Sequence, residues 1–293
     1  MERPLVSICC ITYNQVRYIR QCLEGFLMQK VSFPYEIIIN DDCSTDGTTD
    51  IVREYAERFS TMIVPIYHDE NQYSKGVRGM FATYCVPKAK GKYIALCEGD
   101  DYWIDPLKLQ KQVDFMEANP EYSLCFHNAV VLNERVEIKE RVNSFCCFKQ
   151  DQQISTERLI EDWCIPTASI LYRKASFDQL DLPRFFSGDY TLELGLASVG
   201  KVHYIDRYMS VYRLNNGGIS SKISVKKWAN QLYDLLEWYD SHTQHKYHND
   251  IQCRIREVRK NTRYIAFKER CMLLPVICMP KYTLKMLRNK LGI

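Results

Sequence analysis

The sequence predicts an α/β fold in which a mostly parallel central sheet is flanked by helices. Strand-like apolar runs alternate with helically periodic segments through the first 120 residues, and three of those runs end in polar clusters. Of the 293 residues, 46% are apolar and 26% charged, with 12 Gly and 10 Pro. This composition excludes fibrous, low-complexity and disordered chains.

The N-terminal part divides into four β–loop–α units. A helix start is expected after each polar break, because Asn, Asp, Ser and Thr cap helix N-termini. The expected strands are 6–11, 35–39, 62–67 and 93–97, and the expected helices are 16–27, 49–59, 80–89 and 106–118.

The remaining chain is less regular. Strands are expected at 122–132 and 165–172 and a helix at 188–198, followed by two short strands within 202–213 that bend near Arg207. Residues 133–153 have no clear period and receive no assignment. From Val225 onward the apolar spacing is helical.

Three polar clusters follow strands: Thr12–Asn14, Asp41–Asp42 and Asp100–Asp101. In open α/β sheets, ligands bind in the crevice beyond the carboxyl ends of the strands. Two adjacent carboxylates there suit Mg²⁺ or Mn²⁺ shared with a diphosphate, although a turn and helix cap would also use Asp-Asp. Asp46-Gly47-Thr48 fits a turn and N-cap better than a ligand contact.

Several functional classes are excluded or disfavoured. The chain has no GxGxxG and no GxxxxGK[ST] motif, which disfavours dinucleotide enzymes and P-loop NTPases. A net charge of +3 does not indicate a nucleic-acid partner. The chain has 13 cysteines, an odd number, and no CxxC motif, and its first residues do not have a signal-peptide pattern. Reduced cytosolic thiols are therefore expected. No apolar run reaches the roughly 20 residues of a membrane span.

Three motifs in this order and spacing resemble family 2 glycosyltransferases, which are inverting enzymes of the GT-A fold. They are VSICCITYN (6–14), IIINDDCSTDGT (37–48) and EGDDYW (98–103), and the similarity covers roughly residues 4–220. The resemblance implies a nucleotide-sugar donor, a UDP-sugar first of all, and a divalent metal, Mn²⁺ or Mg²⁺. It places Thr12, Tyr13, Asn14, Asp42 and Asp100 around the nucleotide and Asp101 on the metal.

The same resemblance implies a catalytic base at the start of a later helix. Ser187-Gly-Asp-Tyr190 matches that position, which makes Asp189 the expected base and Glu193, one turn on, the reserve. An acceptor hydroxyl is a weak nucleophile until a positioned carboxylate takes its proton. A helix N-cap is the competing interpretation of Asp189.

One position departs from the family pattern. Relatives often have Tyr-Arg-x-His before Gly-Gly, whereas this chain has Asn215 in place of the histidine, which puts a third protein ligand for the metal in doubt. Arg213 is expected to pair with phosphate. Trp103 and His127 are further candidates for the acceptor or metal vicinity, although a lone His is more often structural.

These expectations divide the chain into a catalytic domain, residues 1–221, and a basic helical extension, 222–293. The domain has a nucleotide-binding half (about 1–120) and an acceptor half (about 121–221). The extension carries a net charge of +9 and the rest −6. Its last part, residues 271–293, fits either an interfacial membrane segment or a helical hairpin packed on the domain.

The sequence thus favours a cytoplasmic enzyme, peripheral on the inner membrane if the tail binds lipid. It would build bacterial surface polysaccharide on a glycan or lipid-linked acceptor. Two alternatives remain open: a sugar-phosphate nucleotidyltransferase, which would need a Gly-rich phosphate loop that residues 6–20 lack, and a non-catalytic nucleotide- or glycan-binding module.

Overall fold

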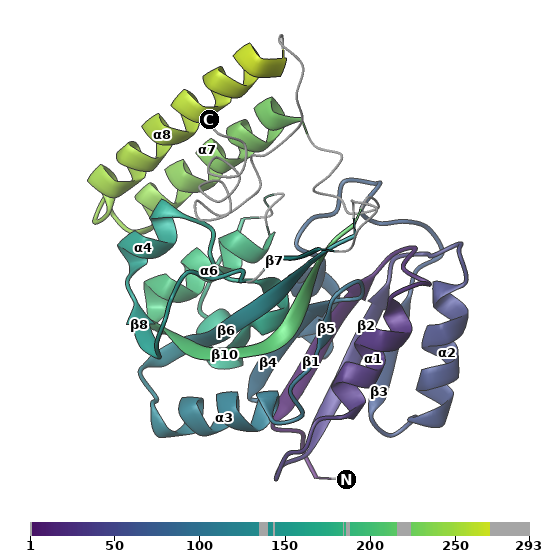
Figure 1. Cartoon of the computed structure of the whole chain (residues 1–293). Helices are drawn as coiled ribbons and strands as arrows, with labels where there is room; N and C mark the ends of the chain where they lie inside the picture. The colour runs from purple at the N-terminus through teal and green to yellow at the C-terminus, as the bar shows by residue number, and fades with distance from the viewer. Residues whose placement is uncertain are drawn as a thin grey trace.

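The computed structural model describes residues 2–134, 140–142, 144–183, 185, 188–215 and 224–269. One sheet runs through the molecule in the order β3-β2-β1-β4-β9-β6-β10-β5, with β7 beside β6 and β8 beside β10. Figure 1 shows α1 and α2 beside the N-terminal strands, and the pair α7 and α8 above α4 and α6. The predicted α/β architecture is confirmed.

Four parallel strands form the N-terminal half: β1 (Val6–Thr12), β2 (Tyr35–Asp41), β3 (Ile63–Tyr67) and β4 (Tyr93–Glu98). The helices between and after them are α1 (Ile19–Leu27), α2 (Thr48–Arg58) and α3 (Lys108–Ala118). The bounds of each of these strands and helices lie within three residues of the predicted ones, because the alternation of apolar runs and polar breaks marks where each element begins and ends.

The predicted helix 80–89 is replaced by a π-helical turn, Phe81–Cys85, and a 3₁₀ turn, Val86–Lys88. Pro87 stands inside this segment. Because proline lacks the N–H that an interior α-helical position donates, a regular helix does not continue through it.

The second half of the sheet is mixed. It contains β5 (Tyr102–Trp103), β6 (Tyr122–Asn133), β7 (Glu140–Val142), β8 (Gln152–Ile154), β9 (Leu171–Arg173) and β10 (Lys201–Leu214). The helices here are α4 (Thr156–Glu161), α5 (Lys174–Phe177) and α6 (Gly188–Val199). Strand β9 is antiparallel to both β4 and β6, whereas β10 is parallel to β6.

Two predicted strands differ from the structure. Of the expected strand 165–172, only Leu171 and Tyr172 pair in the sheet, as part of β9, because a 3₁₀ turn at Thr167–Ser169 follows Pro166. The expected pair of strands in 202–213 is one strand, β10, and its register against β6 shifts between Ile205 and Tyr208. A bulge, rather than a break, explains the irregular pattern near Arg207.

The strands bury side chains on both faces. Val6, Ile8 and Cys10 of β1 belong to the apolar cluster beneath α1, α2 and α3, whereas Cys9 points into a second cluster that includes α4, α6, α7 and α8. Such two-sided burial gives parallel strands their continuous apolar runs. Eleven cysteines lie in the described ranges, all as free thiols and eight of them buried.

A helical hairpin follows the sheet: α7 (Val225–His242) and α8 (His248–Glu269). It packs through α7 on α6 and through α8 on α4. Residues 271–293, the part with the open membrane-or-hairpin alternative, lie outside the described residues. Among the helices that are described, none is both long and apolar enough to cross a membrane.

Candidate active site

The three predicted motifs meet at one edge of the sheet. Thr12 stands opposite Asp41 in the β1–β2 register, and Ile11 stands opposite Glu98 in the β1–β4 register. All three strands therefore end at the same level. The sheet topology brings the first, second and third motifs together, as parallel strands at neighbouring positions require.

Glycine is needed at the centre of the acidic turn that follows β4. A side-chain carbon at Gly99 would lie 2.5 Å from Gln15 Oε1 and 2.8 Å from Thr12 Oγ1, and the Gly99 N–H donates to Ile11 O at 2.9 Å. The turn is thus pressed against the end of β1. Thr12 is buried and directs its hydroxyl at Gln15 (2.8 Å), so it supports this contact.

Asp101 is the most deeply buried of the acidic side chains in this turn, with 1% of its surface exposed. Its Oδ1 accepts a hydrogen bond from the Arg213 backbone N–H at 2.8 Å, while Oδ2 has no hydrogen-bond partner in the described part of the chain. Burial, followed by the nearby charge of Asp100, raises the pKa of the Asp101 carboxyl well above its usual value. A buried carboxylate oxygen that accepts no hydrogen bond is available to coordinate a metal ion.

Asp100 is partly exposed and is held by residues from the end of β10. Its Oδ2 accepts a hydrogen bond from Asn215 Nδ2 at 2.8 Å. The residue that replaces the family's histidine thus contacts the first carboxylate of the motif. Burial raises the pKa of Asp100, and the Asn215 hydrogen bond partly offsets this.

Glu98 was not among the residues predicted from the sequence. Burial, Asp100 and Asp189 raise the pKa of its carboxyl to about 8. Burial and the charges of four carboxyls also raise the pKa of Tyr212. Those four are Glu98, Asp100, Asp101 and Asp189. The signal that could have found Glu98 is its place as the last residue of a parallel strand.

Asp189 lies in the first turn of α6. The α6 N-terminus is packed against the loop after β3: a side-chain carbon at Gly188 would lie 3.3 Å from Gly79 Cα. Asp189 Oδ1 accepts from the Tyr190 N–H at 2.8 Å, and Oδ2 from Thr167 Oγ1 at 3.5 Å. Burial raises its pKa, which brings the carboxyl closer to the range of a working base.

Glu193 is the reserve candidate for the base, but it is fully buried. Its Oε1 accepts a 3.2 Å hydrogen bond from Trp163 Nε1, and burial followed by Asp189 raises its pKa well above the usual value. A carboxyl with no exposed surface cannot meet an acceptor hydroxyl in this conformation. Asp189 is partly exposed and remains the better-placed of the two.

Arg213 contacts the acidic turn and holds it from outside. Its guanidinium donates to Asp100 O at 2.6 Å and to Gln21, pairs with Glu134 at 3.6 Å, and lies over the rings of Tyr18 and Tyr102. The side chain is only 5% exposed. These contacts hold the acidic turn, and the phosphate contact of Arg213 stays a prediction.

The second motif holds a loop. Both carboxylate oxygens of Asp42 accept backbone N–H groups, Oδ1 from Gln72 (2.7 Å) and Oδ2 from Tyr73 (3.0 Å). The loop they hold continues to Gly79, beside the start of α6. Asp42 therefore connects the predicted nucleotide side to the predicted base.

The other predicted nucleotide contacts differ in exposure. Tyr13 is 46% exposed, so its ring is free to stack on a base. Asn14 has a positive φ of 52°, and its side-chain oxygen accepts from the Thr45 N–H at 2.8 Å. Asn14 thus joins two loops in this structure. Asp46 caps Thr48 and receives the Val16 N–H, as the turn interpretation predicted.

Two predicted site residues belong to the core. His127 is fully buried, its Nδ1 lies 2.8 Å from Asn128 O, and burial lowers its pKa well below the usual value. Trp103 is 2% exposed and donates to Ala168 O at 2.8 Å. Neither side chain reaches the surface, and their place near the acceptor or metal stays a prediction.

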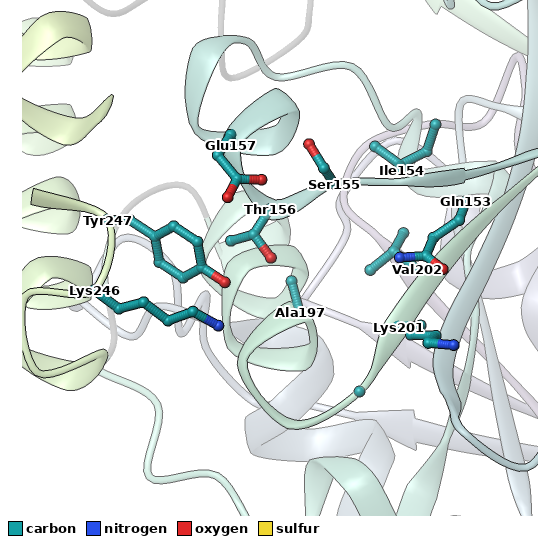
Figure 2. Close-up of a pocket in the computed structure, with 11 residues that line it drawn as sticks. Gln153, Ile154, Ser155, Thr156, Glu157, Ala197, Lys201, Val202, Lys246 and Tyr247 are labelled. Carbon is teal, nitrogen blue, oxygen red and sulfur yellow. The ribbon is translucent and has the colours of Figure 1, made fainter. Parts of the chain in front are cut away.

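A cavity of about 290 Å³ lies elsewhere, between α4, the start of β10 and the α7–α8 turn (Figure 2). Lys201 and Val202, at the beginning of β10, line this cavity, whereas Asp101 of the acidic turn contacts Arg213 near the end of that strand. It is therefore separate from the candidate active site.

Comparison with known proteins decides the family. A family model described as glycosyl transferase family 2 matches residues 7–180, which is more than half of the chain. The chain belongs to this family. Its fold is the GT-A fold of this family.

Two relatives illustrate the range. An uncharacterized protein of Mycobacterium tuberculosis is 39% identical over 73% of this chain, which spans only 60% of the relative's length. The Escherichia coli protein WfaP, named as a UDP-Glc:α-D-GlcNAc-diphosphoundecaprenol β-1,3-glucosyltransferase, is 29% identical over 74% of this chain and 80% of its own.

Solved structures of low identity share the fold. Residues 1–349 of Staphylococcus aureus TarS, in complex with UDP-GlcNAc, superpose with a TM-score of 0.64 at 19% identity, covering 80% of this chain and 65% of that solved chain. The mannosyltransferase PcManGT of Pyrobaculum calidifontis, in complex with GDP-Man and Mn²⁺, has a TM-score of 0.60 at 15% identity and covers 100% of this chain and 81% of its own.

Proposed function

We propose that this glycosyltransferase transfers a sugar from a nucleotide-diphosphate donor, a UDP-sugar first of all, to a hydroxyl of a glycan or lipid-linked acceptor with inversion. The role would be in bacterial surface-polysaccharide synthesis. The observation that carries the proposal is the meeting of the three motifs at one edge of the sheet, where Asp101 has a buried oxygen with no hydrogen-bond partner among the described residues. WfaP, whose name specifies UDP-Glc, and the TarS structure, which was solved with UDP-GlcNAc, support the donor class.

In this proposal Asp189 is the base. It would accept the proton of the acceptor hydroxyl while that oxygen attacks the anomeric carbon and the bond to the diphosphate breaks. A single displacement of this kind inverts the configuration. The partial exposure of Asp189 and its raised pKa both suit a group that must contact the acceptor and hold a proton briefly.

The acidic residues fit a divalent metal, which Asp101 would hold with Asp100 beside it. When bound, Mg²⁺ or Mn²⁺ would supply positive charge for the departing diphosphate. The fit rests on the orphaned Asp101 Oδ2 and on carboxyls that raise one another's pKa values. Asn215 would keep Asp100 oriented through its amide.

The test is donor turnover by the full chain with UDP-glucose, Mn²⁺ and a set of sugar-diphosphate-lipid acceptors, measured as acceptor-dependent UDP release. Asp189→Asn should bind UDP-glucose as the wild type does but lose transfer by about 10²–10⁴-fold. Asp178→Asn is the matched control, because Asp178 is half-exposed and forms an ion pair with Lys174 on the surface. Unchanged turnover by Asp189→Asn would refute the assignment of the base.

A further inference from the structure

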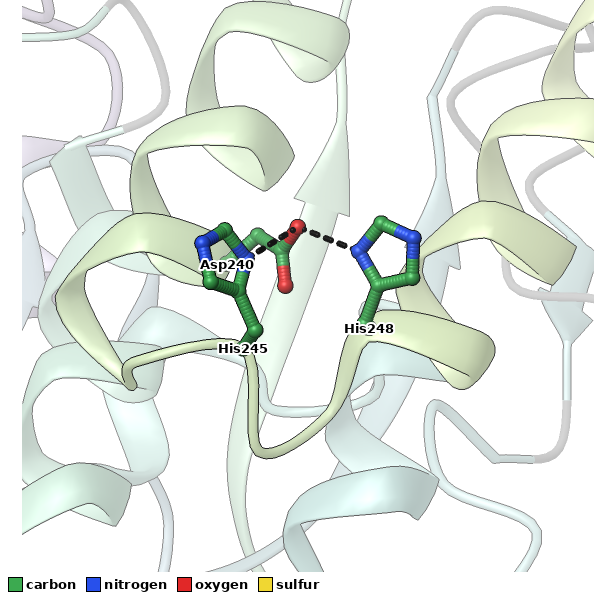
Figure 3. A group of neighbouring side chains, drawn as sticks. All are labelled: Asp240, His245 and His248. Carbon is green, nitrogen blue, oxygen red and sulfur yellow. Dashed lines mark hydrogen bonds and ion pairs between the residues drawn. The ribbon is translucent and has the colours of Figure 1, made fainter.

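The turn between α7 and α8 brings together a carboxylate and two imidazoles, far from the acidic site. Asp240 Oδ2 lies 2.7 Å from His248 Nδ1 and 3.2 Å from His245 Nδ1. Figure 3 shows both rings directed at the one carboxylate. One ligand atom from each residue can be chosen so that all three lie within 4.8 Å of one another.

The backbone of the turn produces this arrangement. Gln244 and His245 both adopt left-handed conformations, with φ of 51° and 62°, and the His245 N–H donates to Asp240 O at 2.8 Å. The chain therefore reverses within one turn of the end of α7, and His245 folds back onto Asp240. His248 then begins α8 on the other side of the carboxylate.

A second observation points to a missing ligand. Asp240 is 7% exposed, and its Oδ1 is buried with no hydrogen-bond partner among the described residues. Asp240 is thus a nearly buried carboxyl with one oxygen unused by the described residues.

We propose that Asp240, His245 and His248 bind a divalent transition-metal ion of the Zn²⁺ class. Two imidazoles and a carboxylate are a donor set that zinc accepts, with water as the fourth ligand. In a tetrahedral site, donor atoms stand about 3.3 Å apart, so the observed distances require only a small expansion. Both rings are half-exposed or more, which leaves the fourth position open to solvent.

The donor chemistry distinguishes this site from the acidic cluster. Imidazole favours Zn²⁺, Co²⁺ and Ni²⁺, whereas an all-carboxylate set favours Mg²⁺ and Mn²⁺. The metal would fasten the end of α7 to the start of α8. The same turn supplies Lys246 and Tyr247 to the wall of the cavity in Figure 2, so binding would also fix that wall.

The test is Co²⁺ titration of the EDTA-treated full chain in excess Mg²⁺, followed by visible absorption, with Zn²⁺ displacing the signal. We expect one equivalent of Co²⁺ to give intense tetrahedral bands and to raise the melting temperature. His245→Gln and His248→Gln should each abolish the bands. Asp101→Ala should retain them, so loss of the proposed catalytic metal and loss of this site are separable.

His242→Gln is the matched control, because His242 lies on the same helix end but contacts Ser198 and stacks on Trp238. It should keep the bands. The proposal is overturned if the wild type gives no tetrahedral bands, or if His248→Gln gives the same bands as the wild type. If the wild type gives no bands and His248→Gln has a lower melting temperature than the wild type, the cluster is a hydrogen-bonded turn only.

Discussion

Asn215 donates a 2.8 Å hydrogen bond from its side-chain amide to the carboxylate of Asp100. This contact joins the end of β10 to the acidic turn after β4, two segments separated by more than 110 residues. A residue that departs from the family pattern is therefore part of the site.

Asn215→Ala should weaken donor use because it removes a hydrogen bond to a charged group, worth about 1.5 kcal/mol. The expected result is a rise of about tenfold in the donor KM with a smaller change in kcat. Steady-state kinetics at fixed Mn²⁺ measures this. Asn119→Ala is the control, since it removes an amide hydrogen bond to Phe115 O at the end of α3. An equal effect from both variants would contradict a local role for Asn215.

Asp101→Asn should stabilise the metal-free protein while abolishing its response to metal. The substitution removes a buried carboxyl whose pKa burial raises, so the metal-free variant is expected to be more stable at neutral pH. Thermal unfolding with and without Mn²⁺ checks both parts. A variant that is still stabilised by Mn²⁺ as strongly as the wild type would place the metal elsewhere.

The pH dependence of stability should reflect Glu98. Burial and neighbouring carboxyls raise its pKa from 4.5 to about 8 in the folded state. Because the folded state binds this proton more tightly, its stabilising contribution is complete below about pH 4.5 and is lost as the pH rises toward 8.

Metal-free Glu98→Gln should therefore lose less stability than the wild type between pH 5 and pH 8. Chemical denaturation at several pH values measures the slope. Glu57→Gln, on the exposed face of α2, serves as the control and should leave the slope unchanged. If the Glu98 variant and the wild type have the same slope, the carboxyl is not protonated in the folded state.

Asp42→Ala should release the loop that its carboxylate holds. The Gln72 and Tyr73 N–H groups would lose their acceptors, and the loop beside the α6 N-terminus would open more often. Faster proteolysis within residues 71–79 and a lower kcat are expected together. Asp50→Ala, an exposed residue of α2, should change neither. Unchanged cleavage in Asp42→Ala would mean that the loop is fixed by other contacts.

The parallel half of the fold could be predicted because each strand is a continuous apolar run followed by a polar turn. The mixed half could not. The β9 segment is interrupted by the turn after Pro166, and β10 carries a bulge that mimics two short strands. Both features depend on tertiary pairing, which local periodicity does not contain.

The site shows the same limit. The clusters of Asp42 and Asp100–Asp101 were found from their positions at strand ends, and the structure brings them to one edge. The burial of His127 and Trp103 could not be predicted, because a sequence does not reveal which face of a strand is covered. Glu98 was missed because its burial and its interaction with Asp189, about 90 residues further along the chain, arise only in the folded protein. The roles assigned to Asp101 and Asp189 remain predictions.

The most direct test of the proposed function is thermal unfolding of the purified full chain with UDP, GDP, dTDP and CMP, each with and without Mn²⁺, in the wild type and Asp101→Ala. Selective binding to the folded state raises the melting temperature. We predict stabilisation by UDP that requires Mn²⁺ and disappears in Asp101→Ala. Equal stabilisation of both proteins, or none by any nucleotide in the wild type, would contradict a metal-dependent nucleotide-sugar site at the acidic turn.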